Sequence, residues 1–247
     1  MRAQSYQTVA HGADTIQFFQ LRRSVGGCEK FHGAVIAHAG TADTRVFREV
    51  TQLGKELEKI GSRVMGSENH AKVGIIFDWE NYWALEYTSG PNRDLRYVDQ
   101  IEQMYNYFYN KNIAVDMIPI DADFSKYDLV AAPVLYMVKD GVAESLEAYV
   151  QAGGTLITTY MSGIVGQSDN VHLGGYPGPL RKMAGVWVEE IDALAPEQRN
   201  KIRFADGTEE ECRLVCDLMH LEGAEEIAQY ESCLLYTSPS PRDYAAS

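Results

Sequence analysis

The first part of the chain carries the pattern of one β/α unit. The stretch DTIQFFQL (14–21) sets Ile16, Phe18 and Phe19 among polar neighbours, which predicts a buried strand. A long loop rich in Gly, Ala and His follows over 22–43. Long connections of this kind inside a compact domain are usually functional, so we expect the site residues of this unit to lie there.

A helix is predicted directly after that loop. Over 44–61 the apolar side chains recur at helical spacing and form one stripe. Asp43 or Thr44 can cap the N-terminus of this helix, and Gly61 can end it. Strand, loop and helix therefore make a first domain of residues 1–61, with the loop at the carboxyl end of the strand.

The pattern changes at about residue 62, where short apolar runs alternate with amphipathic stretches. Strands are predicted over 72–77, 113–120, 127–138 and 155–160, with helices over 97–110 and 142–154. This alternation indicates an α/β fold with an open, largely parallel sheet of the flavodoxin or amidotransferase-like type. Further short strands are predicted within 201–230, around the Asp206-Gly207 turn. The second domain is expected to span 62–232.

The two ends depart from this organisation. Met1 leads straight into a helix-like segment, which indicates an internal methionine of a longer protein. The stretch CLLYTSPSPRDYAAS (233–247) breaks the acidic character of the residues before it. Residues Cys233 to Asp243 match, in order, the translation of a sequencing adapter. We therefore interpret 233–247 as a disordered artefact rather than a natural tail rich in Pro and Ser.

The composition of the chain argues against several classes of binding partner. At 45% hydrophobic and 23% charged, the 247 residues have ample material for a core. The net charge of −13 argues against a nucleic-acid or anionic-membrane surface. No apolar run reaches the roughly 18–20 residues of a membrane helix. The four cysteines are too sparse for a disulfide framework, which fits a reducing, cytoplasmic compartment.

The stretch GGCEKFHGA (26–34) holds the strongest candidate site residues. Glu29 and His32 lie three apart in a glycine-bounded loop. A carboxylate that accepts from hydroxyl groups, beside an imidazole, is suited to bind a sugar. The residues alone favour a solvated glutamate with a locally satisfied histidine. A metal site is a further alternative, but His38 is its one additional nearby candidate, and the spacing is poor for three ligands.

Three further segments have simpler interpretations. FDWENYWALE (77–86) interleaves acids with aromatic residues, which suits a sugar site or a subunit contact, and we favour the contact. The glycine-rich stretch 172–185 fits neither the Walker nor the dinucleotide pattern, so it predicts a tight turn before a helix and no cofactor. Cys212 and Cys216 lack a second pair of ligands at zinc spacing and are predicted to be packed thiols.

Two stretches together resemble the bacterial β-galactosidases of glycoside hydrolase family 42. SYQTVAHGADTIQFFQLRRSVGGCEKFHGAVIAHAG (5–40), with TRVFREVTQLGKELE after it, is similar to the last strand, loop and helix of the family's (β/α)8 catalytic barrel. VGIIFDWENYWALE, with HLGGYPGPLRKMAGVWVEEIDAL, resembles the family's middle α/β domain. The similarity runs from Met1 to about Ser232, and Cys28 departs from it where the family usually carries a small residue.

The resemblance implies a fragment of a retaining enzyme that hydrolyses terminal β-D-galactosyl residues and forms homotrimers through its middle domain. Glu29 and His32 would bind galactosyl hydroxyls at the cleaved bond. The acid/base and nucleophile glutamates would lie upstream of Met1, so no catalytic residue is assigned here and the fragment is expected to be inactive. No cofactor or metal is implied.

The competing class is a non-catalytic, amidotransferase-like α/β module for binding or assembly. An amidotransferase would place a cysteine nucleophile on a sharp turn after a central strand. The candidate strand LVAAPVLYMV (129–138) ends in Leu135, Tyr136 and Met137, without a cysteine. We therefore expect the second domain to act as a scaffold for assembly.

Overall fold

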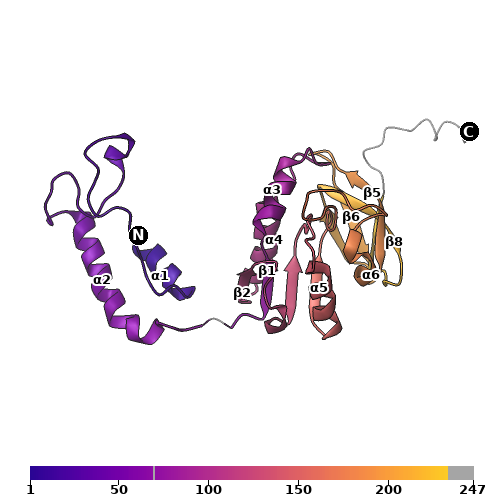
Figure 1. The fold of residues 1–247 in the computed structure, drawn as a ribbon, viewed down its shortest axis with the longest axis horizontal. Coiled ribbons are helices and arrows are strands. Elements are labelled where there is room, and N and C mark those ends of the chain that lie inside the picture. The colour runs from indigo at the N-terminus through magenta and orange to yellow at the C-terminus, as the bar shows by residue number, and fades with distance from the viewer. Residues whose placement is uncertain (69, 233–247) are drawn as a thin grey trace, which may run out of the picture. The chain divides into compact units, whose positions relative to one another are not determined.

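The structure, a computed structural model, describes residues 1–68 and 70–232. The predicted artefact at 233–247 lies outside these residues. The chain forms two compact units, Met1–His70 and Ala71 onward (Figure 1). No helix within the described ranges is both long enough and apolar enough to cross a membrane.

The first unit consists of two helices joined by a long loop. Helix α1 (Arg2–Ala10) packs on α2 (Arg45–Val64), where Leu53 is buried. Glu56 of α2 accepts hydrogen bonds from Arg2 and Tyr6 of α1, at 2.8 and 3.0 Å. The Thr44 hydroxyl caps α2 by accepting from the Phe47 backbone N–H, as predicted, and the helix runs past Gly61 to Val64.

The strand predicted at 14–21 is absent from the described part of this unit, so that prediction is wrong. The backbone pairs only at an isolated parallel bridge between Arg22 and Ile36. A strand is stabilised by hydrogen bonds to neighbouring strands, and residues 1–68 contain none. Without that ladder and the core behind it, Phe19 and Leu21 are 75% and 66% exposed.

The second unit is built on a four-stranded parallel sheet, which confirms the predicted α/β fold. Its strands are β1 (Val73–Ile76), β2 (Val115–Ile118), β3 (Leu129–Ala132) and β4 (Thr155–Thr158), in the order β2-β1-β3-β4. In this register Val73 lies beside both Val115 and Leu129. The chain order reverses between β1 and β3, which is where open sheets of this type bind ligands.

Alternate residues of the central strands face two separate cores. Ile75 and Ala131 pack toward α3 (Trp79–Tyr87) and α4 (Tyr97–Tyr109) on one side of the sheet. Ile76 and Val130 pack toward α5 (Val142–Gln151) on the other side (Figure 1). This follows from the period of two in a strand, and it explains why β1 is apolar at every position.

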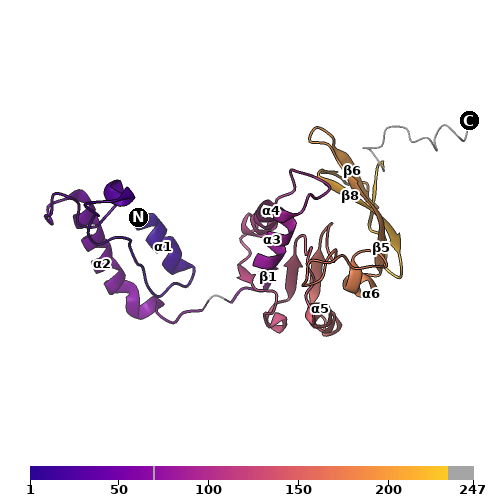
Figure 2. The same ribbon diagram turned by 45° about the horizontal axis from the view of Figure 1, so that its top comes forward.

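Two antiparallel sheets follow the parallel one (Figure 2). The first pairs β5 (Val186–Ala193) with β8 (Val215–Leu221), and the second places β6 (Asn200–Phe204) between β7 (Glu209–Cys212) and β9 (Ala228–Tyr230). The predicted Asp206-Gly207 turn joins β6 to β7, and Gly207 supplies the φ of +85° that this turn needs.

The glycine-rich stretch forms the predicted turn before a helix. The short helix η3 (Gly178–Leu180) leads into α6 (Arg181–Ala184), which Gly185 ends in a left-handed conformation. Gly163 lies against this turn, and an added Cβ would be 2.0 Å from the Pro177 carbonyl oxygen. Only glycine fits there. The remaining short helices are η1 (Cys28–Phe31) and η2 (Phe124–Lys126).

A buried carboxyl lies where β8 meets the end of the parallel sheet. Asp217 is 7% exposed and accepts a hydrogen bond from the backbone N–H of Met161, which follows β4. Its Oδ1 is buried without a hydrogen-bond partner among the described residues. Burial raises the pKa of Asp217 to about 6, and the Met161 hydrogen bond opposes this rise.

This carboxyl predicts a pH-dependent stability. Because the pKa of Asp217 is higher in the folded chain than the ordinary carboxyl value, stability falls as the pH rises from about 4 through 6. Asp217→Asn keeps the shape and an acceptor oxygen. It should therefore be more stable than the unmodified chain near pH 7.5, by about 1–3 kcal/mol, with the difference vanishing near pH 4. Urea unfolding at both pH values measures this, and a pH-independent difference would contradict it.

Candidate functional site

The loop that carries Glu29 and His32 is closed at its base and turned at its tip. At the base, Ile36 N–H donates to the Leu21 carbonyl at 2.7 Å. At the tip, Gly27 takes a φ of +69° and starts the short helix η1. The His32 backbone N–H then donates to the Glu29 carbonyl at 3.0 Å, so the two residues lie on one short turn.

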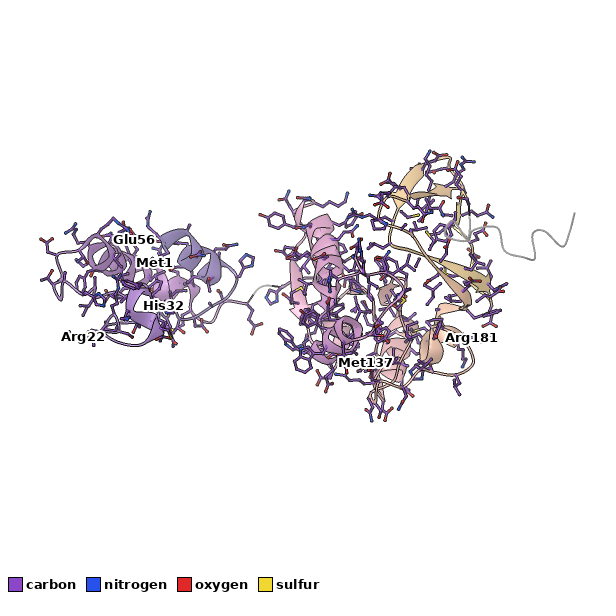
Figure 3. All side chains as sticks on the ribbon, turned by 90° about the horizontal axis from the view of Figure 1, so that it is seen from above. Met1, Arg22, His32, Glu56, Met137 and Arg181 are labelled. Atoms are coloured by element: carbon purple, nitrogen blue, oxygen red, sulfur yellow. The ribbon has the colours of Figure 1, made fainter. Side chains whose placement is uncertain are left out.

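Both side chains are accessible on this turn. Glu29 is half-buried and His32 is exposed. Figure 3 labels His32 in the first unit. Within residues 1–68 and 70–232 neither side chain has a hydrogen-bond partner, so the carboxylate and the imidazole have their polar atoms available. A carboxylate can accept from two hydroxyl groups, and a neutral imidazole can donate or accept. The turn can therefore bind a polyhydroxylated ligand.

His38 is held elsewhere on the same loop. Its Nε2 lies 2.9 Å from the Ser24 carbonyl oxygen, which commits that nitrogen to the loop backbone. Across the described residues no group of three or more His, Cys, Asp and Glu side chains is placed to hold a metal ion. The geometry therefore gives no support to the metal alternative at Glu29 and His32.

Two polar side chains near the base of the loop were not singled out from the sequence. Gln20 Nε2 and Arg23 Nε are buried and have no hydrogen-bond partner among the described residues. Their signal in the sequence is weak, because polar residues are common where a predicted strand passes into a loop.

In the second unit, the carboxyl edge of the parallel sheet is filled by the protein's own groups. Asp78 follows β1, caps α3 by accepting from Asn81 N–H, and pairs with Lys139 at 2.8 Å. Asn81 is fully buried; its Nδ2 donates to the Val134 carbonyl at 3.0 Å, and its Oδ1 accepts from Met137 N–H at 2.7 Å. The Asp78 carboxylate and the Asn81 amide therefore stabilise the fold of this domain.

Apolar residues form the sharp turns of this edge. Val134 after β3 and Met161 after β4 have left-handed φ values of +47° and +57°. The candidate strand 129–138 therefore ends earlier than predicted, at Ala132, because the chain turns at Val134. The Thr159 hydroxyl accepts from Val134 N–H at 2.8 Å. The two left-handed residues are apolar, and the Thr159 hydroxyl is engaged with the backbone of the first turn.

An exposed aromatic stripe runs along α3. Trp79, Trp83 and Tyr87 follow each other at intervals of four residues and are 59%, 59% and 89% exposed. Residues four apart lie on the same face of a helix, so the three rings form one surface. Large contiguous aromatic surfaces of this kind mark sites of contact.

The acids among these aromatic residues are engaged within the domain. Glu80 forms an ion pair with Lys139, and Glu86 accepts from Arg96 at 2.6 Å and from Tyr97 N–H at 3.3 Å. A sugar site would need carboxylates free to accept from hydroxyl groups. The geometry therefore favours a contact surface over a sugar site at 77–86.

Comparison with known proteins matches both units. The family described as "Beta-galactosidase trimerisation domain" matches residues 71–240, and the family described as "Beta-galactosidase" matches residues 1–60. β-Galactosidase LacZ of Lactobacillus acidophilus is 53% identical over 232 residues, which cover 94% of this chain and 35% of that relative. β-Galactosidase BgaB of a Geobacillus species is 50% identical over 231 residues, with 94% and 34% covered.

Solved structures give the same result. The crystal structure of a β-galactosidase from Bacillus circulans sp. alkalophilus superposes with a TM-score of 0.88 at 51% identity, covering 94% of this chain and 35% of that one. The cold-adapted β-galactosidase from Rahnella sp. R3 superposes with a TM-score of 0.85 at 47% identity, covering the same shares of the two chains.

The fold and the comparisons together define an α/β module of the β-galactosidase trimerisation-domain class, preceded by a short helical unit with an exposed Glu-His turn. The chain belongs to glycoside hydrolase family 42, the β-galactosidases. It spans about a third of the length of the relatives it matches.

Proposed function

We propose that this chain is part of a cytoplasmic, retaining β-galactosidase that hydrolyses terminal β-D-galactosyl residues. The observation that carries the proposal is the match over 94% of the chain, at 53% identity, to a β-galactosidase. Residues 1–61 would supply the last β/α unit of a (β/α)8 barrel. Residues 62–232 would form the trimerisation domain.

In this proposal Glu29 and His32 bind hydroxyl groups of the galactosyl ring. Their support is the accessible turn on which both lie, together with the absence of competing hydrogen bonds in the described residues. A carboxylate paired with a hydroxyl forms a charge-assisted hydrogen bond, which is about twice as strong as a neutral one. The two residues would hold one sugar ring from one turn.

The bond-breaking groups would lie in the rest of the barrel. A retaining glycosidase uses two carboxyl groups about 5–5.5 Å apart, one as nucleophile and one as acid/base. At the carboxyl edge of the second unit, Asp78 and Glu80 both pair with Lys139, and Asp78 also caps α3, so we assign neither of them a catalytic role. We propose that both catalytic glutamates precede this segment in the intact enzyme, and that this chain alone is inactive.

Replacing Glu29 in the intact enzyme tests the sugar-binding role. Glu29→Gln keeps the shape but turns one acceptor oxygen into an NH2 donor that faces a hydroxyl. Losing one or two charge-assisted hydrogen bonds should lower kcat/KM on a β-galactoside by about ten- to a few hundred-fold. Glu58→Gln is the matched control, since Glu58 is an exposed glutamate on α2. Steady-state kinetics of both variants measure the effect.

Further variants test whether Glu29 and His32 bind the same sugar ring. His32→Ala should cost a similar factor, and the double variant should lose less than the product of the two, because both residues bind one ring. If the Glu29→Gln enzyme has the kcat/KM of the unmodified enzyme, Glu29 does not bind the sugar and is a solvated loop residue.

We also propose that the intact protein is a homotrimer, and that the aromatic stripe of α3 (Trp79, Trp83 and Tyr87) is part of the contact between its copies. The support is the exposure of the three rings on a domain that matches a trimerisation family. Aromatic residues, and tryptophan above all, contribute most of the binding free energy at the centres of such contacts.

Truncating the middle ring of the stripe tests this surface. Trp83→Ala in the intact protein should weaken assembly at least about thirty-fold, which corresponds to about 2 kcal/mol for a tryptophan at the centre of a contact. Tyr107→Ala is the matched control, because Tyr107 is an exposed ring on α4 outside the stripe. Sedimentation velocity over a concentration series gives the dissociation constants. Equal assembly of both variants would place the contact elsewhere.

A further inference from the structure

We propose that Cys212 and Cys216 form a dithiol modification site, which a small anionic disulfide oxidises to an intramolecular disulfide. The site lies in the second unit, remote in sequence from Glu29 and His32, and does not rest on the proposed function. It rests on three observations: the approach of the two sulfurs, their unequal access, and the pocket beside them.

The backbone brings the two thiols together. Cys212 ends β7 and Cys216 lies in β8. Between them the chain reverses at Leu214, which has a φ of +76°, and Val215 N–H donates to the Arg213 carbonyl at 3.1 Å. The two Sγ atoms are 3.7 Å apart as free thiols. The S–S bond of a disulfide is about 2 Å long, so the two sulfur atoms need only a small further approach to form one.

Access to the two sulfurs is unequal. Cys212 is partly exposed and lines a pocket of about 420 Å³. Cys216 is 1% exposed, and the Asn200 amide Nδ2 donates to its Sγ at 3.7 Å. A reagent in the pocket therefore meets Cys212 first. Cys216 is reached through the neighbouring sulfur of Cys212.

The lining of the pocket indicates the class of reagent. Arg213 contributes a guanidinium group beside Cys212, and its side chain has no ion pair or hydrogen bond among the described residues. Glu211 also lines the pocket, but its carboxylate pairs with Arg199 at 3.2 Å. Gln100, Gln103 and Tyr107 of α4 add polar groups to the lining of the pocket. A guanidinium attracts carboxylates, so a peptide disulfide that carries carboxylates, such as glutathione disulfide, fits the pocket chemically.

The reaction balances as two thiol–disulfide exchanges. The Cys212 sulfur attacks one sulfur of the reagent, which breaks the reagent's S–S bond and releases one thiol that takes up the proton. The Cys216 sulfur then attacks Cys212 Sγ, forms the internal disulfide and releases the second thiol. The two protein thiols lose two electrons, and the reagent disulfide gains them.

The burial of the two thiols slows this exchange. Burial raises the pKa of Cys212, and it raises the pKa of Cys216 to about 12, with the neighbouring thiol adding to the rise. Glu211 and Asp192 also face the sulfurs and disfavour the thiolates. Because the thiolate is the attacking species, the exchange is slow at neutral pH, and the dithiol persists in a reducing environment.

The test uses the full chain with the other two cysteines replaced, as Cys28→Ser and Cys233→Ser. The protein is incubated with glutathione disulfide at about pH 8.5, near the ordinary pKa of a thiol, then alkylated and digested with trypsin. Cleavage after Arg203 and Arg213 places Cys212 on peptide 204–213 and Cys216 on a separate peptide beginning at residue 214. We expect these two peptides to appear joined by a disulfide in the mass spectrum.

Single variants in the same background resolve the two steps. Cys216→Ser should keep a stable glutathione adduct on Cys212, and Cys212→Ser should leave Cys216 unmodified while the chain is folded. A persistent adduct on Cys212 beside a reduced Cys216 in the two-cysteine chain would overturn the proposal. So would modification of Cys216 in Cys212→Ser as fast as modification of Cys212 in Cys216→Ser. The joined peptides are read in the two-cysteine chain, so the result does not depend on how either single variant folds.

Discussion

The buried amide of Asn81 fixes the two central strands of the parallel sheet at their carboxyl ends. It lies in α3, directly after β1, and hydrogen-bonds the Val134 carbonyl and the Met137 N–H beyond β3. An apolar side chain at this position would leave the buried Met137 N–H without its acceptor, at a cost of about 1–3 kcal/mol, and would remove one of the two hydrogen bonds to the Val134 carbonyl. Asp78, which caps the same helix and binds Lys139, holds the start of α3 in the same place.

This arrangement fills the carboxyl edge of the parallel sheet with the protein's own groups. The edge at which open sheets usually bind ligands is occupied by Asn81 and by the Thr159 hydroxyl, which accepts from Val134 N–H. Because the inner face of α3 is committed to the sheet, its outer face can present Trp79 and Trp83 to a partner. This fits the scaffold role that we propose for the second unit and the sugar-binding role that we propose for Glu29 and His32.

The sequence predicted those parts of the fold whose pattern is local. The sequence correctly predicted the strands β1 and β3 from their apolar runs, the helix α2 from its apolar stripe, and the Asp-Gly hairpin. The strand at 14–21 was predicted and does not form, because strand formation depends on neighbours that the pattern does not reveal. The predicted strand 127–138 ends at Ala132, since Pro133 has no N–H to donate and Val134 turns left-handed. Strand β5 was not predicted, because the acidic residues in VWVEEIDA interrupt the apolar pattern of a strand.

The candidate site was predictable only in part, for a related reason. The spacing of Glu29 and His32 singled them out, but their sugar-binding role came from a family resemblance and stays a proposal. Asn81 and Asp217 were not recognised as buried, because a sequence shows that a residue is polar and not which partners a fold will bring to it. The most direct measurement is hydrolysis of a chromogenic β-galactoside by the purified chain, with circular dichroism verifying that its α/β unit is folded. We expect no turnover above that of buffer. Measurable turnover would contradict the proposal that both catalytic glutamates lie outside this chain.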